Sequence, residues 1–421
     1  MLSLVAAPAF GRAAPPAEGG AAGAVLRAVL AGGPLTRAAL GRAIGLSPAA
    51  VSRHTAELIA LGLLRELPPE GPPRAGRPQL PLDIDTRGHL ALGVHIGVPW
   101  LTFALLDLRG RVVAHERLPR QGDAADVLRA VREHLPGFVR RWSGGRSLLG
   151  LGVVTGGWVD SERGTVVEHG PLGWQDVPVR DVLAGVTRLP VHLDSHARAL
   201  AQAELLFGAG AGATELVHLF VGNVVDAAIA TGGGVLRGRR SRAGDIGHLP
   251  VPGSAEPCPC GRTGCLQAAV SERTLARRAY RDGVLPVPDF DRLLALAGAG
   301  EPAALRLFEE RLRLVAPAAE LLLNVLNPEV LVVTEAGLAV APQLADHLHE
   351  RIAGHGRMAG HGRIAGHARP EAVRPVTAGS FGTDALAVAA CAGVLDSAYR
   401  RPMELRTAPL GAAVAGRSTG H

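Results

Sequence analysis

The chain has 421 residues, of which 47% are hydrophobic and 19% are charged, and its mean hydropathy is +0.20. This length accommodates about two or three domains, and the composition excludes a wholly disordered chain. No run reaches the roughly 18 uncharged apolar residues that a membrane span needs, and the apolar first residues lack the basic start of a secretory signal. All 44 basic residues are arginines, but the net charge is only +6, so nucleic-acid binding must be argued from local features.

Cysteine usage argues against a secreted protein. Three of the four cysteines lie between Cys258 and Cys265, and Cys391 stands alone. A small extracellular protein would instead carry several paired cysteines. We therefore expect a cytoplasmic protein with a metal site and no membrane association.

The N-terminal part of the chain has the pattern of a winged helix-turn-helix over residues 24–86, behind a flexible arm at 1–23 that is rich in Ala, Gly and Pro. A helix is expected near Ala24–Ala31, and Thr36 caps a second, short helix. After a turn at Gly45, Ser47 and Pro48 are typical of the first residues of a third helix. Two strands, at Leu63–Leu67 and Gln79–Leu82, would form the wing.

Seven arginines and three glutamates fall within residues 24–82, so much of the net charge belongs to this segment. The first turns of a recognition helix face base edges in the major groove, and an arginine there can contact guanine through two hydrogen bonds. We assign Ser47, Ala49, Ser52 and Arg53 to this helix face. Phosphate contacts are expected from Thr36, Arg37 and Thr55, and a minor-groove contact from Arg77. The alternative is a three-helix module that binds protein, with solvated arginines.

Residues 89–396 read as two successive β-β-β-α-β blocks, which predicts two similar α/β lobes with a cleft between them and a lobe boundary near 208–215. The first block starts at Leu90 and the second near Leu216. Residues 397–421 read as a disordered tail.

Residues 351–368 contain three copies of a hexamer, RIAGHG-RMAGHG-RIAGHA. One interpretation is a metal-binding tract of His355, His361 and His367. The simpler one, which we favour, is a duplicated insertion.

The strongest chemical pattern is His248 followed, after nine residues, by Cys258, Cys260 and Cys265 in a loop spanning 248–265. Zinc prefers four nitrogen and sulfur ligands in a tetrahedron, and four protein ligands leave no position for an activated water. The pattern predicts a structural zinc ion rather than a catalytic one; the alternative is three buried cysteines without metal. Gly261 and Gly264 would allow the tight turns that bring the thiolates together.

These residues resemble the zinc signature of the ROK family of repressors and sugar kinases, although Asp245 stands where the family has glutamate. The winged helix, the Ala75–Pro78 linker and the stretch Pro171–Pro178 are also similar to ROK repressors. The resemblance implies an actin-like (RNase H-like) two-lobed sugar-kinase fold, with a sugar bound between the lobes beside the zinc loop.

The sequence departs from the ROK kinases at their catalytic positions. If Glu204 anchors the register, His196 stands where the kinases have a catalytic aspartate; with a shifted register, Asp194 would be the base. The segments that resemble the phosphate and nucleotide loops are altered as well, and Pro99 lacks a backbone donor. The changed segments are His95–Pro99, Gly222–Asp226 and Thr334–Gly337. We expect no phosphoryl transfer.

The resemblance places effector contacts at Ser195, His196, Asp245 and His248, although Pro171 and Gln267 replace two residues of the family's sugar site. We therefore predict a transcriptional regulator that acts as a repressor, binds double-stranded operator DNA and responds to a sugar or sugar-derived effector. We also expect it to contain structural Zn²⁺ and to form a homodimer or homotetramer. Two alternatives stay open: an active sugar kinase with a DNA-binding appendage, and a regulator whose lobes bind a partner protein.

Overall fold

The computed structural model describes residues 20–68, 80–185, 187–358 and 376–405, which form two compact units. The first unit comprises the chain up to His89 together with Ser397–Leu405, and the second comprises Leu90–Asp396. No helix in the described ranges is long and apolar enough to cross a membrane.

The first unit contains three helices, α1 (Gly20–Gly32), α2 (Arg37–Ile44) and α3 (Pro48–Ala60), and an antiparallel pair of strands, β1 (Leu64–Glu66) and β2 (Leu82–Ile84). The predicted helix boundaries follow from local hydrogen bonds. The Thr36 side chain accepts from the backbone N–H of Ala39, and the Ser47 side chain accepts from that of Ala50. Gly45 has φ of 71°, a left-handed conformation that glycine adopts at no steric cost.

Three predicted boundaries in this part of the chain were wrong. Helix α1 begins inside the expected N-terminal arm, and β2 lies later than the strand expected at Gln79–Leu82. The expected C-terminal tail is helical at its start, because α13 (Ala385–Arg400) and a 3₁₀ turn, η4 (Pro402–Glu404), extend beyond residue 397. The last turn of α13 is held within the first unit, where Arg27 Nη1 donates to the Tyr399 carbonyl at 3.2 Å.

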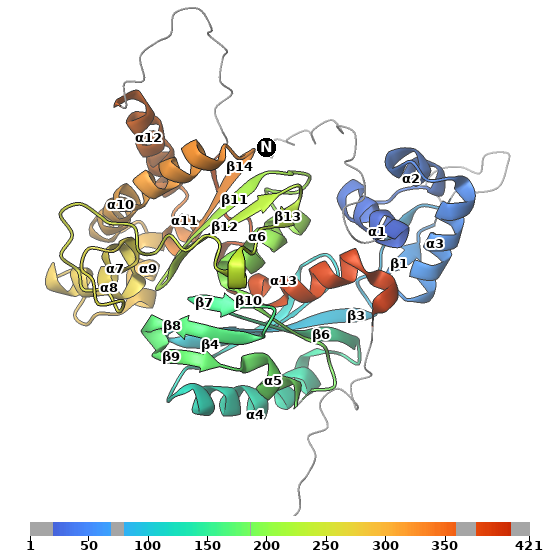
Figure 1. The fold of residues 1–421 in the computed structure, drawn as a ribbon, viewed down its shortest axis with the longest axis horizontal. Coiled ribbons are helices and arrows are strands. Elements are labelled where there is room, and N and C mark those ends of the chain that lie inside the picture. The colour runs from blue at the N-terminus through green and yellow to red at the C-terminus, as the bar shows by residue number, and fades with distance from the viewer. Residues whose placement is uncertain (1–19, 69–79, 186, 359–375, 406–421) are drawn as a thin grey trace, which may run out of the picture. The chain divides into compact units, whose positions relative to one another are not determined.

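The first lobe of the second unit is a five-stranded sheet with strand order β10-β6-β3-β4-β5. The strands are β3 (His89–Ile96), β4 (Trp100–Leu106), β5 (Val112–Pro119), β6 (Ser147–Thr155) and β10 (Val191–Ser195). Every residue of β3 is buried, because helix α4 (Ala124–Trp142) covers one face of the sheet and α13 covers the other (Figure 1).

The close packing of α13 on this sheet requires glycine at two strand positions. A Cβ on Gly152 would lie 1.9 Å from the Ala390 carbonyl oxygen, and one on Gly93 would lie 2.6 Å from Cys391 Sγ. Any side chain at either position would push the helix off the sheet. The C-terminal helix therefore completes the core of the first lobe, although it follows the second lobe in the sequence.

The second lobe repeats the β-β-β-α-β plan, as predicted, in a sheet of order β13-β12-β11-β14-β15. Helix α6 (His196–Phe207) ends just before the predicted lobe boundary and β11 (Leu216–Val221) begins just after it. The other strands are β12 (Val225–Thr231), β13 (Gly234–Val235), β14 (Val330–Glu335) and β15 (Val376–Ala378). The helices are α7 (Leu266–Val270), α8 (Glu272–Arg281), α9 (Phe290–Gly298), α10 (Pro302–Leu326), α11 (Ala336–Val340) and α12 (Gln343–Met358).

A second, three-stranded sheet in the first lobe was not predicted. It consists of β7 (Trp158–Asp160), β8 (Thr165–His169) and β9 (Trp174–Val177), followed by the short helix α5 (Val179–Ala184). The hexamer repeat begins within the last turns of α12, but residues 359–375, with His361 and His367, lie outside the described residues, as does the side chain of His355.

Candidate functional sites

The first candidate site is the outer face of α3 in the winged-helix unit. Ser47, Ala49, Ser52 and Arg53 are all exposed, whereas Val51 and Leu58 of the same helix are fully buried. The side chains around Arg53 on the first turns of the helix are small. They leave room for another molecule to approach the backbone of this face closely. Arg53 Nη2 lies 3.2 Å from His54 Nε2, and His54 Nδ1 lies 2.9 Å from Glu57 Oε2, which orients the arginine at the surface.

The residues expected to hold phosphates have different environments. Arg37 donates from Nη2 to Glu66 at 2.7 Å and from Nε to the Thr55 hydroxyl at 3.2 Å. Thr55 is fully buried, and its hydroxyl donates to the Ser52 carbonyl. The expectation that Thr55 reaches a phosphate was therefore wrong, because this side chain instead holds Arg37 against α3. Arg77 lies outside the described residues.

The second candidate site brings together His248, Cys258, Cys260 and Cys265. Their ligand atoms all lie within 4.8 Å of one another. Cys258 Sγ is 3.7 Å from His248 Nδ1, and Cys260 Sγ is 3.7 Å from Cys265 Sγ. With zinc–sulfur bonds of about 2.3 Å, two thiolates of a tetrahedral site lie about 3.8 Å apart, so these residues fit a zinc ion.

Local backbone geometry explains how three cysteines in eight residues converge. Gly261 and Gly264 have φ of 85° and 70°, as the predicted tight turns require. The Cys258 N–H donates to the Arg262 carbonyl at 2.8 Å, which closes the loop around the thiols. At Gly264 a Cβ would lie 2.5 Å from the Ser254 carbonyl oxygen, so this position accepts no side chain.

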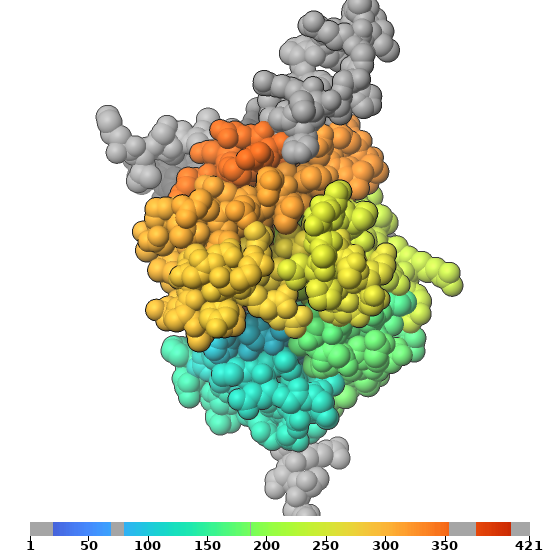
Figure 2. Space-filling model, turned by 90° about the vertical axis from the view of Figure 1, so that its left-hand side faces the viewer, coloured from blue at the N-terminus to red at the C-terminus, as the bar shows by residue number. Residues whose placement is uncertain are grey.

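The third candidate site is a cleft next to the cysteine cluster, within the second unit. Its walls include Trp158, Ser195, Asp226, Asp245, His248 and Gln267. Strand β7 and the start of α6 come from the first lobe, and the other residues come from the second. Figure 2 shows the yellow and orange residues of the second lobe in contact with the cyan and green residues of the first across one face. Three of the four predicted effector residues thus line one cleft.

The fourth predicted effector residue, His196, lies behind the cleft wall at the first position of α6. It is 4% exposed, its ring centroid is 4.0 Å from that of Phe220, and its Nε2 lies 3.9 Å from Asp226 Oδ2. Burial is the largest cause that lowers the pKa of His196 well below 6.5. Neither of its ring nitrogens has a hydrogen-bond partner.

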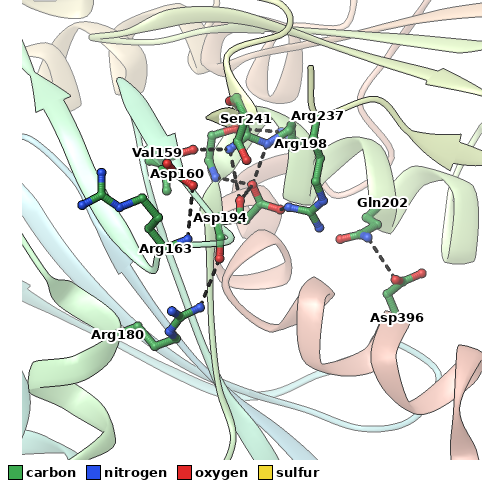
Figure 3. A network of polar contacts seen from close by, with 12 residues as sticks. Val159, Asp160, Arg163, Arg180, Asp194, Arg198, Gln202, Arg237, Ser241 and Asp396 are labelled. Carbon is green, nitrogen blue, oxygen red and sulfur yellow. Dashed lines mark hydrogen bonds and ion pairs between the residues drawn. The ribbon is translucent and has the colours of Figure 1, made fainter. Parts of the chain in front are cut away.

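Asp194, the alternative catalytic base, points to the other side of β10. Its carboxylate accepts from Arg198 Nε at 2.6 Å, from the Ser161 hydroxyl at 2.9 Å and from Arg237 Nη1 at 3.2 Å (Figure 3). It lines a different cavity, away from the cleft. A carboxylate that already accepts these bonds is a poor proton acceptor for a substrate in the cleft.

Arg198, which sequence reasoning missed, joins the two lobes beside the cleft. It is 4% exposed, and besides Asp194 it donates from Nη2 to the Val159 carbonyl of β7 at 2.9 Å. From Nη1 it donates to the Ser241 carbonyl of the second lobe at 2.5 Å. The spacing of Asp194 and Arg198, four residues apart, is a signal for an ion pair, but nothing local indicates the contacts to distant carbonyls.

A second missed residue, Arg311, fills the space between two altered nucleotide-loop segments. It forms a fully buried ion pair with Glu335 and donates to the Val270 carbonyl at 2.7 Å. Its Nη2 also donates to the Val221 and Gly222 carbonyls at 3.3 and 3.4 Å. Position 311 falls on the apolar face of α10, and an arginine within that periodic pattern is the signal that could have revealed it.

The chain is similar to known proteins over both units. The ROK family model matches residues 91–359, and the MarR family model matches residues 19–75. A transcriptional regulator of Mycobacterium tuberculosis (strain ATCC 25618 / H37Rv) is 32% identical over 352 residues, which cover 78% of this chain and 77% of the relative. The DNA-binding transcriptional dual regulator NagC of Escherichia coli K12 is 27% identical, with 76% of this chain and 82% of that protein covered.

Solved structures agree with this fold. A ROK family transcriptional regulator described as a homologue of the E. coli MLC protein covers 90% of this chain and 96% of its own, with 24% identity and a TM-score of 0.71. A ROK family glucokinase from Streptomyces griseus, in complex with glucose and AMPPNP, covers 72% of this chain and 98% of its own, with 25% identity and a TM-score of 0.60. The chain belongs to the ROK family, with a MarR-type winged helix preceding its sugar-kinase-like domain.

Proposed function

We propose that this chain is a DNA-binding transcriptional repressor of ROK type, controlled by a sugar or sugar-derived effector. The observation that carries the proposal is the exposed, small-residue face of α3 around Arg53, in a unit that matches a MarR-type winged helix. A helix with this face fits the major groove, with Arg53 directed at a guanine edge. The regulators among its relatives support the same conclusion.

We expect two copies of this helix to bind one operator. Helix-turn-helix proteins usually bind as dimers, with half-sites one helical turn apart. We therefore expect a homodimer or homotetramer in which the second unit carries the effector and the subunit contacts. An effector that binds one lobe arrangement better than another would change the affinity for DNA. By linkage, bound DNA would change the affinity for the effector by the same factor.

Zinc would be held by His248, Cys258, Cys260 and Cys265. Four protein ligands complete its shell, so the ion would fix the loop that carries one wall of the cleft rather than take part in chemistry. His248 Nδ1 lies 3.7 Å from Cys258 Sγ, so we assign Nδ1 to zinc and Nε2 to the cleft that His248 lines. This arrangement reconciles the two roles predicted for His248, as zinc ligand and effector contact.

The effector would bind between Ser195, Asp245 and His248. Asp245 accepts two hydrogen bonds from Arg242, at 3.1 Å from Nε and 3.0 Å from Nη2, and it stays exposed enough to accept ligand hydroxyls as well. Arg242 lies over the Trp158 ring at 4.5 Å. This carboxylate, aromatic ring and imidazole form a polar site of the kind that sugars need.

Phosphoryl transfer is not expected at this cleft. Transfer from ATP depends on a positioned donor and on groups that stabilise phosphate charge. Here the two altered nucleotide-loop segments are bonded to Arg311, and Asp194, the carboxylate that β10 offers as a base, already accepts hydrogen bonds from Arg198 and Arg237. A glucokinase of Halalkalibacterium halodurans is 29% identical over 61% of this chain. Because of this similarity, the experiments below include a direct assay for kinase activity.

Three experiments test the proposal. The purified chain is incubated with fragmented genomic DNA, and the retained fragments are sequenced; enrichment of a palindromic site is expected, and uniform retention would contradict operator recognition. A coupled assay with ATP, magnesium and common hexoses should show no turnover. Turnover on the order of 1 s⁻¹ would instead support the kinase. Elemental analysis should find about one zinc per chain.

A further inference from the structure

The inner end of the effector cleft has polar atoms without partners. Among the described residues, both ring nitrogens of His196, Oδ2 of Asp226 and Oγ of Ser241 are buried and have no hydrogen-bond partner. Buried polar atoms in folded proteins are nearly always hydrogen-bonded, either within the protein or to a bound group. Asp226 and Ser241 belong to the cleft wall, so these atoms mark the place where a ligand group is expected.

The spacing of two of these atoms selects a particular group. His196 Nε2 and Asp226 Oδ2 are 3.9 Å apart, too far for a direct hydrogen bond. A single oxygen placed between them can lie about 2.8 Å from each. A hydroxyl fits this position, because it accepts one hydrogen bond and donates another.

In the described part of the chain, the two arginines that line the cleft are both paired. Arg198 is fully engaged with Asp194 and two carbonyls, and Arg242 is paired with Asp245. Burial lowers the pKa of His196 well below its usual value, and it lowers the pKa of His95, whose ring centroid is 5.9 Å from that of His196, to about 3. Burial therefore opposes a positive charge on either ring. The group that faces the ligand most directly is the Asp226 carboxyl, whose pKa burial raises to about 7.

Two backbone donors of the segment that carries Asp226 are also committed. The Gly222 N–H donates to the Val224 carbonyl at 3.0 Å, and the Val225 N–H donates to Gln267 Oε1 at 3.4 Å. Anion sites in proteins use arginines or free backbone N–H groups. A phosphate or carboxylate placed between His196 and Asp226 would lose its hydration, would compete with existing partners for Arg198, Arg242 and these two N–H groups, and would face a carboxyl side chain.

We infer that Asp226 and His196 form a specificity element that binds one hydroxyl of an uncharged, polyhydroxylated ligand and excludes the phosphorylated form of the same ligand. This inference rests on the proposed effector site and narrows its ligand class. It gives Asp226, which lies in a segment altered from the kinases, a binding role in place of the lost phosphate contacts.

The test is calorimetric titration of the full-length chain at pH 7.5 with three matched pairs of probes. These are glucose and glucose 6-phosphate, N-acetylglucosamine and N-acetylglucosamine 6-phosphate, and xylose and xylose 5-phosphate. At least one unphosphorylated sugar should bind at least tenfold more tightly than its phosphate ester. Asp226→Ala should weaken that sugar tenfold or more, whereas Asp226→Asn, which keeps a polar group of the same size, should bind it within about threefold.

The outcomes separate this inference from the proposed function. If a phosphate ester binds as tightly as its sugar or more tightly, the specificity element is refuted, while a sugar-derived effector stands. If Asp226→Ala folds and binds the sugar as well as wild type, Asp226 has no role in binding. If none of the six probes binds, the sugar effector is contradicted, and the inference falls with it.

Discussion

Replacing Arg311 by methionine should destabilise the second unit more than any surface change in the same helix. Arg311 and Glu335 have no exposed side-chain area. Methionine fills a similar volume but removes the charge and every donor. Glu335 then keeps its backbone hydrogen bonds from Leu338, at 3.0 Å, and from Gly337, but loses its charged partner. The Val270, Val221 and Gly222 carbonyls lose their guanidinium donors.

The expected loss is about 3–5 kcal/mol of unfolding free energy, the usual cost of leaving one partner of a buried ion pair without the other. The loss of carbonyl partners acts in the same direction, although the contributions are not additive. If the stranded carboxylate causes most of the loss, then adding Glu335→Gln to Arg311→Met should recover at least about 1 kcal/mol, because a neutral amide costs less to bury.

Urea unfolding followed by tryptophan fluorescence measures this loss selectively. All four tryptophans, at positions 100, 142, 158 and 174, belong to the second unit, so the signal reports that unit. Arg313→Met provides the matched control, because Arg313 is exposed on the same helix, and it should change stability by less than about 0.5 kcal/mol. A loss below about 1 kcal/mol for Arg311→Met, or a double variant no more stable than the single one, would refute the reasoning.

Three further changes test the candidate sites. Arg53→Ala should weaken binding to a selected operator by about 1–3 kcal/mol and relax its base preference, measured by fluorescence anisotropy with Arg313→Ala as the control; equal affinity would exclude base contact by Arg53. Cys260→Ser should reduce zinc, measured by elemental analysis, from about one ion per chain to near zero and lower the melting temperature, whereas retained zinc would argue for a different ligand set. Asp226→Asn should stabilise the chain increasingly as pH rises. Since burial raises the pKa of Asp226 from 3.8 to about 7, the carboxyl's stabilising contribution is largest below pH 4 and is lost as pH rises to 7. The free energy of unfolding of the asparagine variant, measured in urea relative to wild type, should therefore rise by up to about 3 kcal/mol between pH 5 and pH 8. A difference between the two proteins that stays constant with pH would mean that the carboxyl titrates normally.

Local signals were enough to predict the winged helix and the cysteine cluster. A cap such as Ser47 acts on an N–H three residues away, and Gly45 and Gly261 set the backbone at their own positions, so each signal is complete within a few residues. The two β-β-β-α-β blocks were also readable, because apolar periodicity reports which face of a strand or helix is buried. The cysteine and histidine signature carried the resemblance to the ROK family, and the family model over residues 91–359 showed membership.

Tertiary structure alone decided the environment of the side chains at the cleft. Asp194 and His196 are two residues apart, yet one is tied up by arginines and the other is buried without a hydrogen bond. Thr55 has a hydroxyl of the kind that contacts phosphates, but its side chain is fully buried. The partners of Arg198 and Arg311 come from segments roughly 24 to 90 residues away, apart from Asp194. Such contacts depend on how segments distant in the sequence pack together, within a lobe or between the lobes, and no pattern within a single helix or strand encodes them.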